Sequence, residues 1–218
     1  MTICLTRIDP LDLARYLGRK PVEVEPLTLD WATSRERQRV IARAIQDGRQ
    51  TMNLRTMPGA ELVVARGSDG RLAGWGGVDV GSDPQYPEMF SWFVCAEFRG
   101  VGLGALFEYV ALTKLDHAGC STAFVRMGSD ADPGLVERHL ASGHYQVVRS
   151  GDLPPRFVGA CRKCELFDNA CRRQVFLAVD VRKALAASAT GRGPLDLAAL
   201  PLRIPEGAER FRRFPAVG

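Results

Sequence analysis

The chain has 218 residues, of which 46% are hydrophobic and 25% are charged. This composition is typical of a globular protein and excludes a disordered, collagen-like or coiled-coil chain. Because domains usually run about 100 to 200 residues, we expect one domain with appended arms. No apolar run approaches the roughly 18 residues that cross a bilayer, and Arg7 and Asp9 interrupt the N-terminus before a signal-peptide core could form. We therefore expect a cytoplasmic protein with no membrane partner.

The net charge of +4 comes entirely from the C-terminal end of the chain. Residues 1–181 contain 22 basic and 22 acidic residues, whereas residues 182–218 contain seven basic and three acidic ones. Phosphate-backbone binding needs a concentrated basic surface on the folded domain, so this distribution argues against a nucleic-acid partner. The last segment also contains four prolines, and we expect it to form a basic arm that is mobile or wraps the surface.

The first predicted elements are a strand and a helix, followed by a hairpin. Apolar and polar residues alternate over 22–30, which predicts a strand, and a helix is expected over 35–46 with Thr33 or Ser34 as its cap. Period-two runs on either side of the turn residues 68–70 predict an antiparallel hairpin. Residues 1–60 are therefore expected to pack as a strand and helix region on a core that begins at residue 61.

The core continues with an apolar run, MFSWFVCAEF, that predicts a central strand. It leads into a glycine-rich segment, residues 99–105, which opens an amphipathic helix that ends at Gly119. A strand (STAFVRMG), a helix over about 134–142, and strands over 145–148 and 174–181 come next. The order of strand, glycine turn, helix, strand and helix indicates a mixed α/β domain over 61–181.

The glycine segment has a chemical interpretation and a purely structural one. Gly100, Gly102 and Gly104 leave backbone N–H groups free to point at one spot, where a helix N-terminus adds its positive dipole end, and this geometry suits a pyrophosphate. The alternative is a turn that only permits tight packing. A Walker A loop is excluded because no Lys-Ser or Lys-Thr follows the glycines. A dinucleotide fingerprint is disfavoured because a meander precedes the turn and the next strand contains Arg126 rather than a carboxylate.

Three segments resemble the GCN5-related N-acetyltransferases (GNAT superfamily). The run Arg99-Gly100-Val101-Gly102-Leu103-Gly104-Ala105-Leu106 is similar to the family's Gln/Arg-x-x-Gly-x-Gly/Ala motif, with Val94 and Glu97 placed as in its V-x-P-E-x-R-G pattern. Residues 139–144 stand where the family often has Tyr-x-x-x-Gly-Phe, and QVFLAVDV is similar to its final strand. The resemblance covers about residues 61–181. It implies a mostly antiparallel mixed sheet flanked by helices, with one splayed parallel strand pair.

The same resemblance implies acyl-CoA, and acetyl-CoA first of all, as co-substrate. In the family a bulged strand pairs with the pantetheine arm as an added strand would, and the glycine turn binds the pyrophosphate through main-chain amides. Carried over to this chain, the expected binding residues are Phe93, Val94, Cys95, Arg99, Gly100, Val101, Gly102, Leu103 and Gly104. The implied reaction is transfer of an acyl group to an amine of a small molecule or peptide.

Direct transfer needs a group that takes a proton from the amine and a donor for the departing thiolate. Glu88, at the start of the central strand, is the first candidate for the base, with Asp79 and Glu97 as weaker ones. His139 occupies the position at which the family usually has a tyrosine that serves the thiolate, and Tyr145 lies farther along the chain. Histidine can donate a proton near neutrality, but it can equally be a passive helix residue, so both interpretations stay open.

The expected loop over 149–173 contains three cysteines, Cys161, Cys164 and Cys171, spaced C-x₂-C-x₆-C. They could hold a structural zinc ion if His144 or another residue completes the site, they could be ordinary reduced thiols, or they could form a redox-sensing dithiol beside basic residues. The second C-x-x-C pair of a zinc ribbon is missing. In the family that the chain resembles, this loop joins the last two strands and borders the acceptor pocket. Because the loop is basic here, the resemblance implies an acceptor that bears a carboxylate, such as an amino acid.

The sequence therefore favours an N-acetyltransferase over two other classes of protein. One is a non-catalytic acyl-CoA-binding or thiol/zinc-sensing module on the same fold, and the other is an adaptor that acts through the basic arm. Acceptor identity and acyl length depend on variable loops and stay open. The sequence also leaves the oligomeric state open, with a homodimer among the options.

Overall fold

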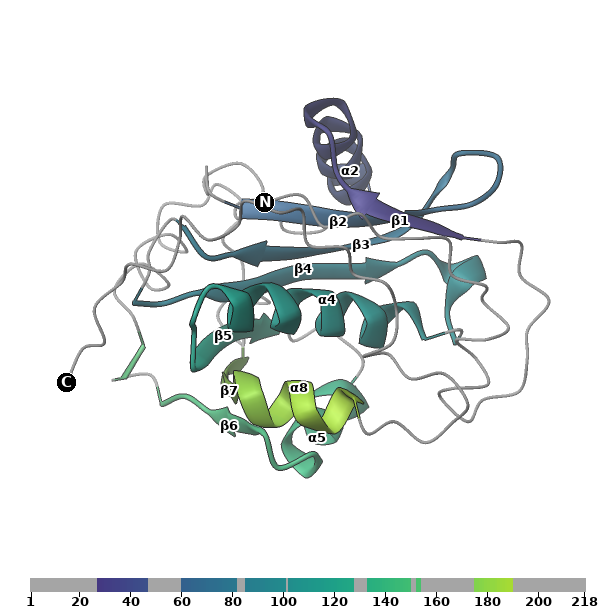
Figure 1. The fold of residues 1–218 in the computed structure, drawn as a ribbon. Coiled ribbons are helices and arrows are strands. Elements are labelled where there is room, and N and C mark those ends of the chain that lie inside the picture. The colour runs from purple at the N-terminus through teal and green to yellow at the C-terminus, as the bar shows by residue number, and fades with distance from the viewer. Residues whose placement is uncertain are drawn as a thin grey trace.

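The structure is a computed structural model that describes residues 27–46, 60–81, 85–100, 102–127, 133–149, 152–153 and 175–189. Within these ranges, seven strands form one sheet in the order β1-β2-β3-β4-β5-β7-β6 (Figure 1). The strands are β1 (Thr28–Trp31), β2 (Ala60–Arg66), β3 (Leu72–Asp79), β4 (Glu88–Val94), β5 (Thr122–Met127), β6 (Tyr145–Val147) and β7 (Val175–Asp180). The helices are α2 (Ser34–Gln46), the 3₁₀ turn η1 (Ala96–Phe98), α4 (Leu103–His117), α5 (Pro133–Ala141) and α8 (Val181–Ala189). Neighbouring strands are antiparallel except for β4 and β5, which confirms the predicted mixed, mostly antiparallel sheet.

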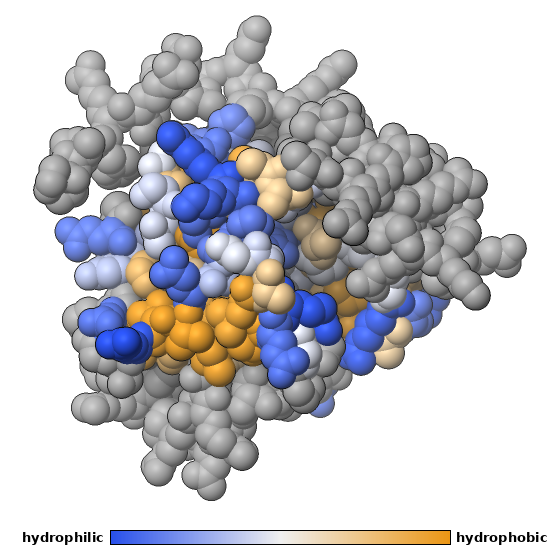
Figure 2. Space-filling model, turned by 90° about the horizontal axis from the view of Figure 1, so that it is seen from below, coloured by the Kyte–Doolittle hydropathy of each residue, from blue (hydrophilic) through white to orange (hydrophobic). Residues whose placement is uncertain are grey.

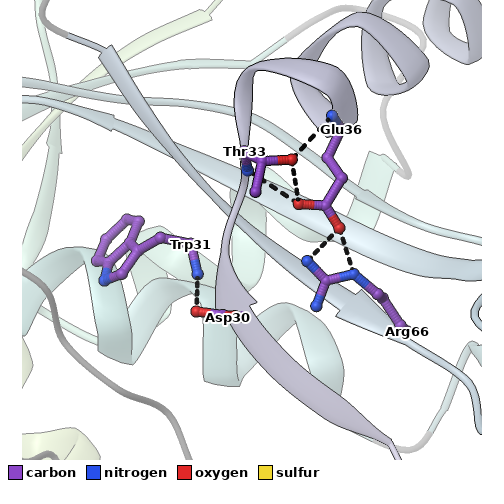
Figure 3. Close-up of polar contacts among 5 residues, drawn as sticks. All are labelled: Asp30, Trp31, Thr33, Glu36 and Arg66. Atoms are coloured by element: carbon purple, nitrogen blue, oxygen red, sulfur yellow. Dashed lines mark hydrogen bonds and ion pairs between the residues drawn. The ribbon is translucent and has the colours of Figure 1, made fainter.

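The start of α2 is fixed by a capping box (Figure 3). The N–H and Oγ1–H of Thr33 both donate to Glu36 Oε2, at 2.9 and 2.8 Å, and the N–H of Glu36 donates to Thr33 Oγ1 at 3.3 Å. Glu36 Oε1 also pairs with the guanidinium of Arg66 on β2. Burial acts to raise the pKa of Glu36, but the hydrogen bonds from Thr33 and Arg66 outweigh it and hold the pKa below its ordinary value. The predicted cap at Thr33 is confirmed, and it ties α2 to the sheet.

Residues 60–79 form the predicted hairpin. The N–H of Gly67 donates to the Arg71 carbonyl at 2.9 Å, and the N–H of Gly70 donates to the Gly67 carbonyl at 3.0 Å. Gly70 has φ of +78°, a conformation that favours glycine, so it can close the turn without strain. The hairpin supplies β2 and β3, which stand between β1 and the central strand β4.

Apolar side chains cover both faces of the sheet. On one face, α4 and α8 pack against the strands, and α4 is buried along most of its length. Figure 1 shows both helices in front of the sheet. On the other face, α2 supplies Val40, Ile41 and Ala44, which join side chains of β2, β3 and β4. We call these the α4 face and the α2 face. The α4 face holds the larger part of the core.

Two elements differ from the sequence-based expectation. β4 ends at Val94 rather than continuing through Phe98, because the chain turns into η1, in which the N–H of Phe98 donates to the Cys95 carbonyl at 2.9 Å. The helix α8 is an element that the sequence pattern does not predict. It begins directly after β7 and buries Val181 and Ala184 on the α4 face. The first residues of the expected basic arm are therefore helical, and the arm beyond residue 189 lies outside the described residues.

The described surface is mixed in polarity. No helix within the described ranges is both long enough and apolar enough to span a bilayer. Seen from the β6 end of the sheet, hydrophilic residues border an apolar area (Figure 2). Leu140 on α5 and Val147 on β6 are large apolar side chains that are exposed. A homodimer stays a prediction.

Candidate active site

The two central strands β4 and β5 separate soon after they begin to run side by side. Their parallel ladder pairs Glu88 with Phe124 and Met89 with Val125, and within the described residues it contains only these two pairs. The rest of β4 therefore has β3 as its ladder partner on one side and an opening toward β5 on the other. We call this opening the β4–β5 gap.

A β-bulge in β4 accounts for the separation. Trp75 of β3 pairs with Phe93, whereas Gly77 pairs with Phe90, so β4 has one residue more than β3 between these pairs. Bulges bend a strand and increase its twist, which turns the end of β4 away from a straight neighbour. An open strand edge of this kind can pair with an extended chain through main-chain hydrogen bonds. The bulge and splay implied by the family resemblance are thus present.

The predicted pantetheine-binding residues form the last part of β4 and the residue after it. Phe93 is buried on the α2 face, and the N–H of Cys95 donates to the Ala73 carbonyl on β3 at 2.9 Å. Because neighbours alternate along an antiparallel ladder, the main-chain groups of Val94 face away from β3. The Val94 carbonyl accepts a hydrogen bond from Arg99 Nε at 3.1 Å. Val94 is therefore the residue of this segment whose backbone faces the gap.

The glycine turn joins this edge to α4. Gly100 and Gly102 have φ of +89° and +92°, and Gly102 is the N-cap of α4 with no side-chain cap in the described structure. A Cβ atom added at Gly100 or Gly104 would meet no other atom within 4 Å. Leu103 is buried in the core, and Val101 lies outside the described residues. Packing alone thus does not require glycine at position 104, and open space lies beside the first turn of a 15-residue helix.

A buried ion pair lies where β4 and β5 begin to separate. Arg126 Nη2 of β5 is 3.2 Å from Glu88 Oε1 of β4, and the two side chains are 9% and 1% exposed. Asp79 of β3 is the cross-strand neighbour of Glu88 and is also buried, with its Oδ1 accepting the N–H of Gly81 at 3.1 Å. We call Asp79, Glu88 and Arg126 the Glu88 cluster. Their neighbours Val78, Met89 and Val125 pack against α4. Because successive side chains of a strand point to opposite faces, all three residues of the cluster lie on the α2 face.

A second polar cluster lies on the α4 face, beside the bulge. His139 of α5 is 9% exposed, and its Nδ1–H donates to the Leu135 carbonyl at 2.7 Å. Its Nε2 is 3.9 Å from Glu108 Oε2 of α4, and its ring stacks on Trp92 of β4 with centroids 6.3 Å apart. Tyr145 of β6 donates its hydroxyl hydrogen bond to Glu108 Oε1 and meets the imidazole edge to face at 4.6 Å. We call Trp92, Glu108, His139 and Tyr145 the His139 cluster.

The contacts of the His139 cluster define its chemistry. Because a carbonyl only accepts, Nδ1 carries a hydrogen, and Nε2 is the nitrogen that can gain or release a proton. Within the described residues, His139 Nε2 and Trp92 Nε1 are buried and have no hydrogen-bond partner. Burial, and then the charge of Glu108 and the hydrogen bond to it, raise the pKa of Tyr145 well above its ordinary value. Tyr145 therefore stays a neutral donor, and Glu108 is a partly buried acceptor that lies between α5 and β6.

Comparison with known proteins gives a match of fold. No family sequence model and no curated protein sequence matches the chain. A GNAT-family acetyltransferase from Staphylococcus aureus has a similar structure, with a TM-score of 0.52 and 13% identity, over 71% of this chain and 99% of that one. The chain has the GNAT fold. A GNAT-family acetyltransferase from Elizabethkingia anophelis with acetyl-CoA bound gives a TM-score of 0.51 and 13% identity, over 71% and 97%. N-acetylglutamate synthase from Neisseria gonorrhoeae, complexed with coenzyme A and N-acetyl-glutamate, gives a TM-score of 0.51 and 15% identity, over 78% of this chain and 40% of that one.

Within this GNAT fold, the two predicted catalytic residues lie on opposite faces of the sheet and do not form one cluster. Glu88 lies on the α2 face and His139 on the α4 face. The weaker base candidate Asp79 neighbours Glu88, whereas Glu97 is an exposed residue of η1. Sequence reasoning missed Glu108 as the partner of His139, because no motif marks it. The roles of all these residues stay predictions.

The predicted zinc ligands do not lie in the part of the chain that the structure describes. Cys161, Cys164 and Cys171 all lie outside the described residues. Among the residues that are described, no group of three or more His, Cys, Asp or Glu side chains could hold a metal ion. Cys95 is buried and donates through its thiol to the Leu72 carbonyl at 3.2 Å. The C-x₂-C-x₆-C zinc site therefore stays a prediction.

Proposed function

We propose that the protein is an acyl-CoA-dependent N-acyltransferase that transfers an acetyl group from acetyl-CoA to an amine. The observation that carries the proposal is the open β4–β5 gap directly before a glycine turn at the N-terminus of α4. A strand edge can pair with an amide-containing arm, and a helix N-terminus favours a diphosphate. Two solved structures with this fold contain acetyl-CoA or coenzyme A, which supports the same co-substrate here.

The chain's own residues fit this co-substrate. Main-chain amides around Gly100, Gly102 and Gly104 would hold the pyrophosphate, since the space beside Gly100 and Gly104 is open. The backbone of Val94, which faces the gap, would pair with the pantetheine arm. Acetyl-CoA supplies the activated thioester, and the protein supplies binding, orientation and proton transfer.

Glu88 and His139 carry the proposed proton transfers. The neutral amine nitrogen attacks the thioester carbonyl carbon, the new C–N bond forms, and the C–S bond breaks. The ammonium proton passes to the Glu88 carboxylate directly or through water, and His139 protonates the departing thiolate when its Nε2 carries a proton. Glu108, 3.9 Å from that nitrogen, supplies the counter-charge. The products are an amide and free coenzyme A, so atoms and charge balance.

We further propose an acceptor that bears a carboxylate, such as an amino acid. Residues 149–173 contain six basic residues against three acidic ones, and guanidinium groups bind carboxylates in a paired geometry. A synthase with the same fold is complexed with N-acetyl-glutamate, a carboxylate product. The check is to compare the best substrate with its decarboxylated analogue. Equal rates for the two would remove this part of the proposal.

The main test is acyl transfer by the pure protein. The protein would be incubated with labelled acetyl-CoA and a panel of amino acids, polyamines, amino sugars and short peptides, and the products separated by mass spectrometry. Calorimetry with coenzyme A would run in parallel. We expect binding, and labelled product with at least one amine. Absence of heat with both coenzyme A and acetyl-CoA would overturn the proposal.

Replacement of the family's tyrosine by His139 favours one alternative, a non-catalytic acyl-CoA-binding module. The same two measurements separate it from an enzyme. Tight binding of acetyl-CoA without release of coenzyme A on any acceptor would support the binding module. Turnover with any amine would exclude it.

A further inference from the structure

The Glu88–Arg126 pair has a geometry set by the register of β4 and β5. Glu88 is level with Phe124, and Arg126 is two residues farther along β5 on the same face, toward the gap. The guanidinium therefore reaches back to Glu88 Oε1 at 3.2 Å. On its other side, Arg126 lies over the ring of Phe176 on β7, with 5.8 Å from Cζ to the ring centroid. Strands β4, β5 and β7 together fix the guanidinium.

Both charges of this pair are almost completely withdrawn from water. A buried carboxylate with no nearby cation takes up a proton instead of staying charged. On the two adjacent strands, the charged neighbours of Glu88 are Asp79 on β3 and Arg126 on β5. On the same face, Arg37 of α2 donates to the carbonyl of Ala60, the cross-strand partner of Asp79, at 2.6 Å. Asp79 is a carboxylate and disfavours a charge on Glu88, whereas the guanidinium favours it. Arginine keeps its charge at every pH at which the protein is folded, so it is a permanent counter-ion.

We propose that Arg126 is a positioning residue that keeps Glu88 ionised and fixes its Oε1 atom at the closed end of the β4–β5 gap, where it can take a proton from the acceptor amine. This inference rests on the proposed function, in which Glu88 is the base. The opposite interpretation is that the pair only stabilises the sheet. The two interpretations predict different results of removing the guanidinium, because only the first makes the protonation of Glu88 depend on Arg126.

The test uses Arg126→Met, which removes the charge, and Arg126→Lys, which keeps it. Full-length proteins labelled with ¹³C at glutamate side-chain carboxyls are titrated by NMR, and the Glu88 signal is assigned by its loss in Glu88→Gln. We expect Arg126→Met to raise the Glu88 titration midpoint by about one to three pH units, and Arg126→Lys to restore most of the wild-type midpoint. Arg182→Met is the matched control, since Arg182 of α8 forms an exposed pair with Asp116 at the C-terminal end of α4.

Kinetics give a second readout that a merely structural role would not produce. At neutral pH, Arg126→Met should transfer acetyl at about one tenth of the wild-type rate or less, and its rate should recover as the pH rises through the shifted midpoint. Affinity for coenzyme A should stay at the wild-type value. Thermal denaturation of each variant shows whether it is folded. Arg126→Gln, which also removes the charge but keeps a polar side chain, takes the place of Arg126→Met if that variant does not fold.

The outcomes are distinct for the two proposals. An unchanged Glu88 midpoint in Arg126→Met, or a rate deficit that high pH does not relieve, would overturn the role of Arg126 while leaving the transferase intact. A raised midpoint in a protein that acetylates no amine would contradict the proposed function and remove the base role from Arg126 with it. A raised midpoint together with a shifted rate profile supports both.

Discussion

The two polar clusters on either side of β4 stabilise a carboxylate in different ways. In the Glu88 cluster, a carboxylate faces a guanidinium that cannot lose its proton. In the His139 cluster, the carboxylate of Glu108 accepts from neutral Tyr145, and an imidazole stands 3.9 Å away. A permanent cation suits a group that must be ionised before the reaction, whereas an imidazole suits a proton that must move during it. The comparison predicts that the α2 face takes the proton from the amine and that the α4 face gives a proton to the departing thiolate.

The largest effect is expected from Glu88→Gln, which removes the base and keeps the shape of the side chain. The rate of acetyl transfer should fall about 1,000-fold, and affinity for coenzyme A should not change, because general-base catalysis typically contributes about 10²–10⁴-fold. Steady-state kinetics and calorimetry measure the two quantities. Glu97→Gln, at an exposed residue of η1, is the control and should keep the wild-type rate. Full activity in Glu88→Gln would show that the Glu88 cluster does not take the proton from the amine.

His139→Gln should lower the rate about 100-fold if the α4 face protonates the thiolate. The sharper measurement uses acetyl-selenocoenzyme A, because a selenolate leaves without needing a proton. The selenoester should restore much of the rate of His139→Gln and little of the rate of Glu88→Gln. Equal rescue of both variants would show that the two clusters do not divide the reaction between them.

Local pattern predicts the elements of this fold well but cannot predict either cluster. The hairpin, the glycine turn and the helix that ends at Gly119 depend on period and turn residues, which are local properties. Arg126 and Glu88 are 38 residues apart in the chain, and Tyr145 and Glu108 are 37 apart. Their contacts depend on strand order and on where the bulge lies, which single-sequence patterns do not contain.

The missed helix α8 has a similar explanation. Its residues VRKALAASA form a short amphipathic segment whose burial depends on α4 being adjacent to it. The proline-rich composition farther along the chain suggests an arm for the whole of 182–218. Asp180 caps the helix by accepting the N–H of Lys183 at 3.1 Å, a local signal that could have located the start of α8.

Gly104→Ala tests whether the first turn of α4 binds the pyrophosphate of the co-substrate that both clusters are proposed to act on. Alanine is the better helix former, and the added methyl group meets no atom within 4 Å, so thermal stability should be equal or slightly higher. The same methyl group would stand where an anion approaches the first amides of α4, so affinity for coenzyme A should fall about tenfold, or about 1.4 kcal/mol. The KM for acetyl-CoA should rise with little change in kcat. Unchanged affinity would place the pyrophosphate elsewhere.

The smallest effect is expected at Glu36, a partly buried carboxylate of α2 that lies in neither cluster. Glu36→Gln should lower the free energy of unfolding by about 1 kcal/mol, because it weakens the capping box and the contact with Arg66, and it should leave acetyl transfer unchanged. The folded-state pKa of Glu36 lies below its ordinary value of 4.5, so its stabilising contribution is complete above that pH and disappears as the pH falls through the folded-state pKa. Urea denaturation at about pH 7 and about pH 3 should therefore show a gap between wild type and variant that closes in acid. A gap of constant size would mean that the charge of Glu36 contributes nothing, and a loss of activity would mean that the α2 cap also supports the acceptor side of β4.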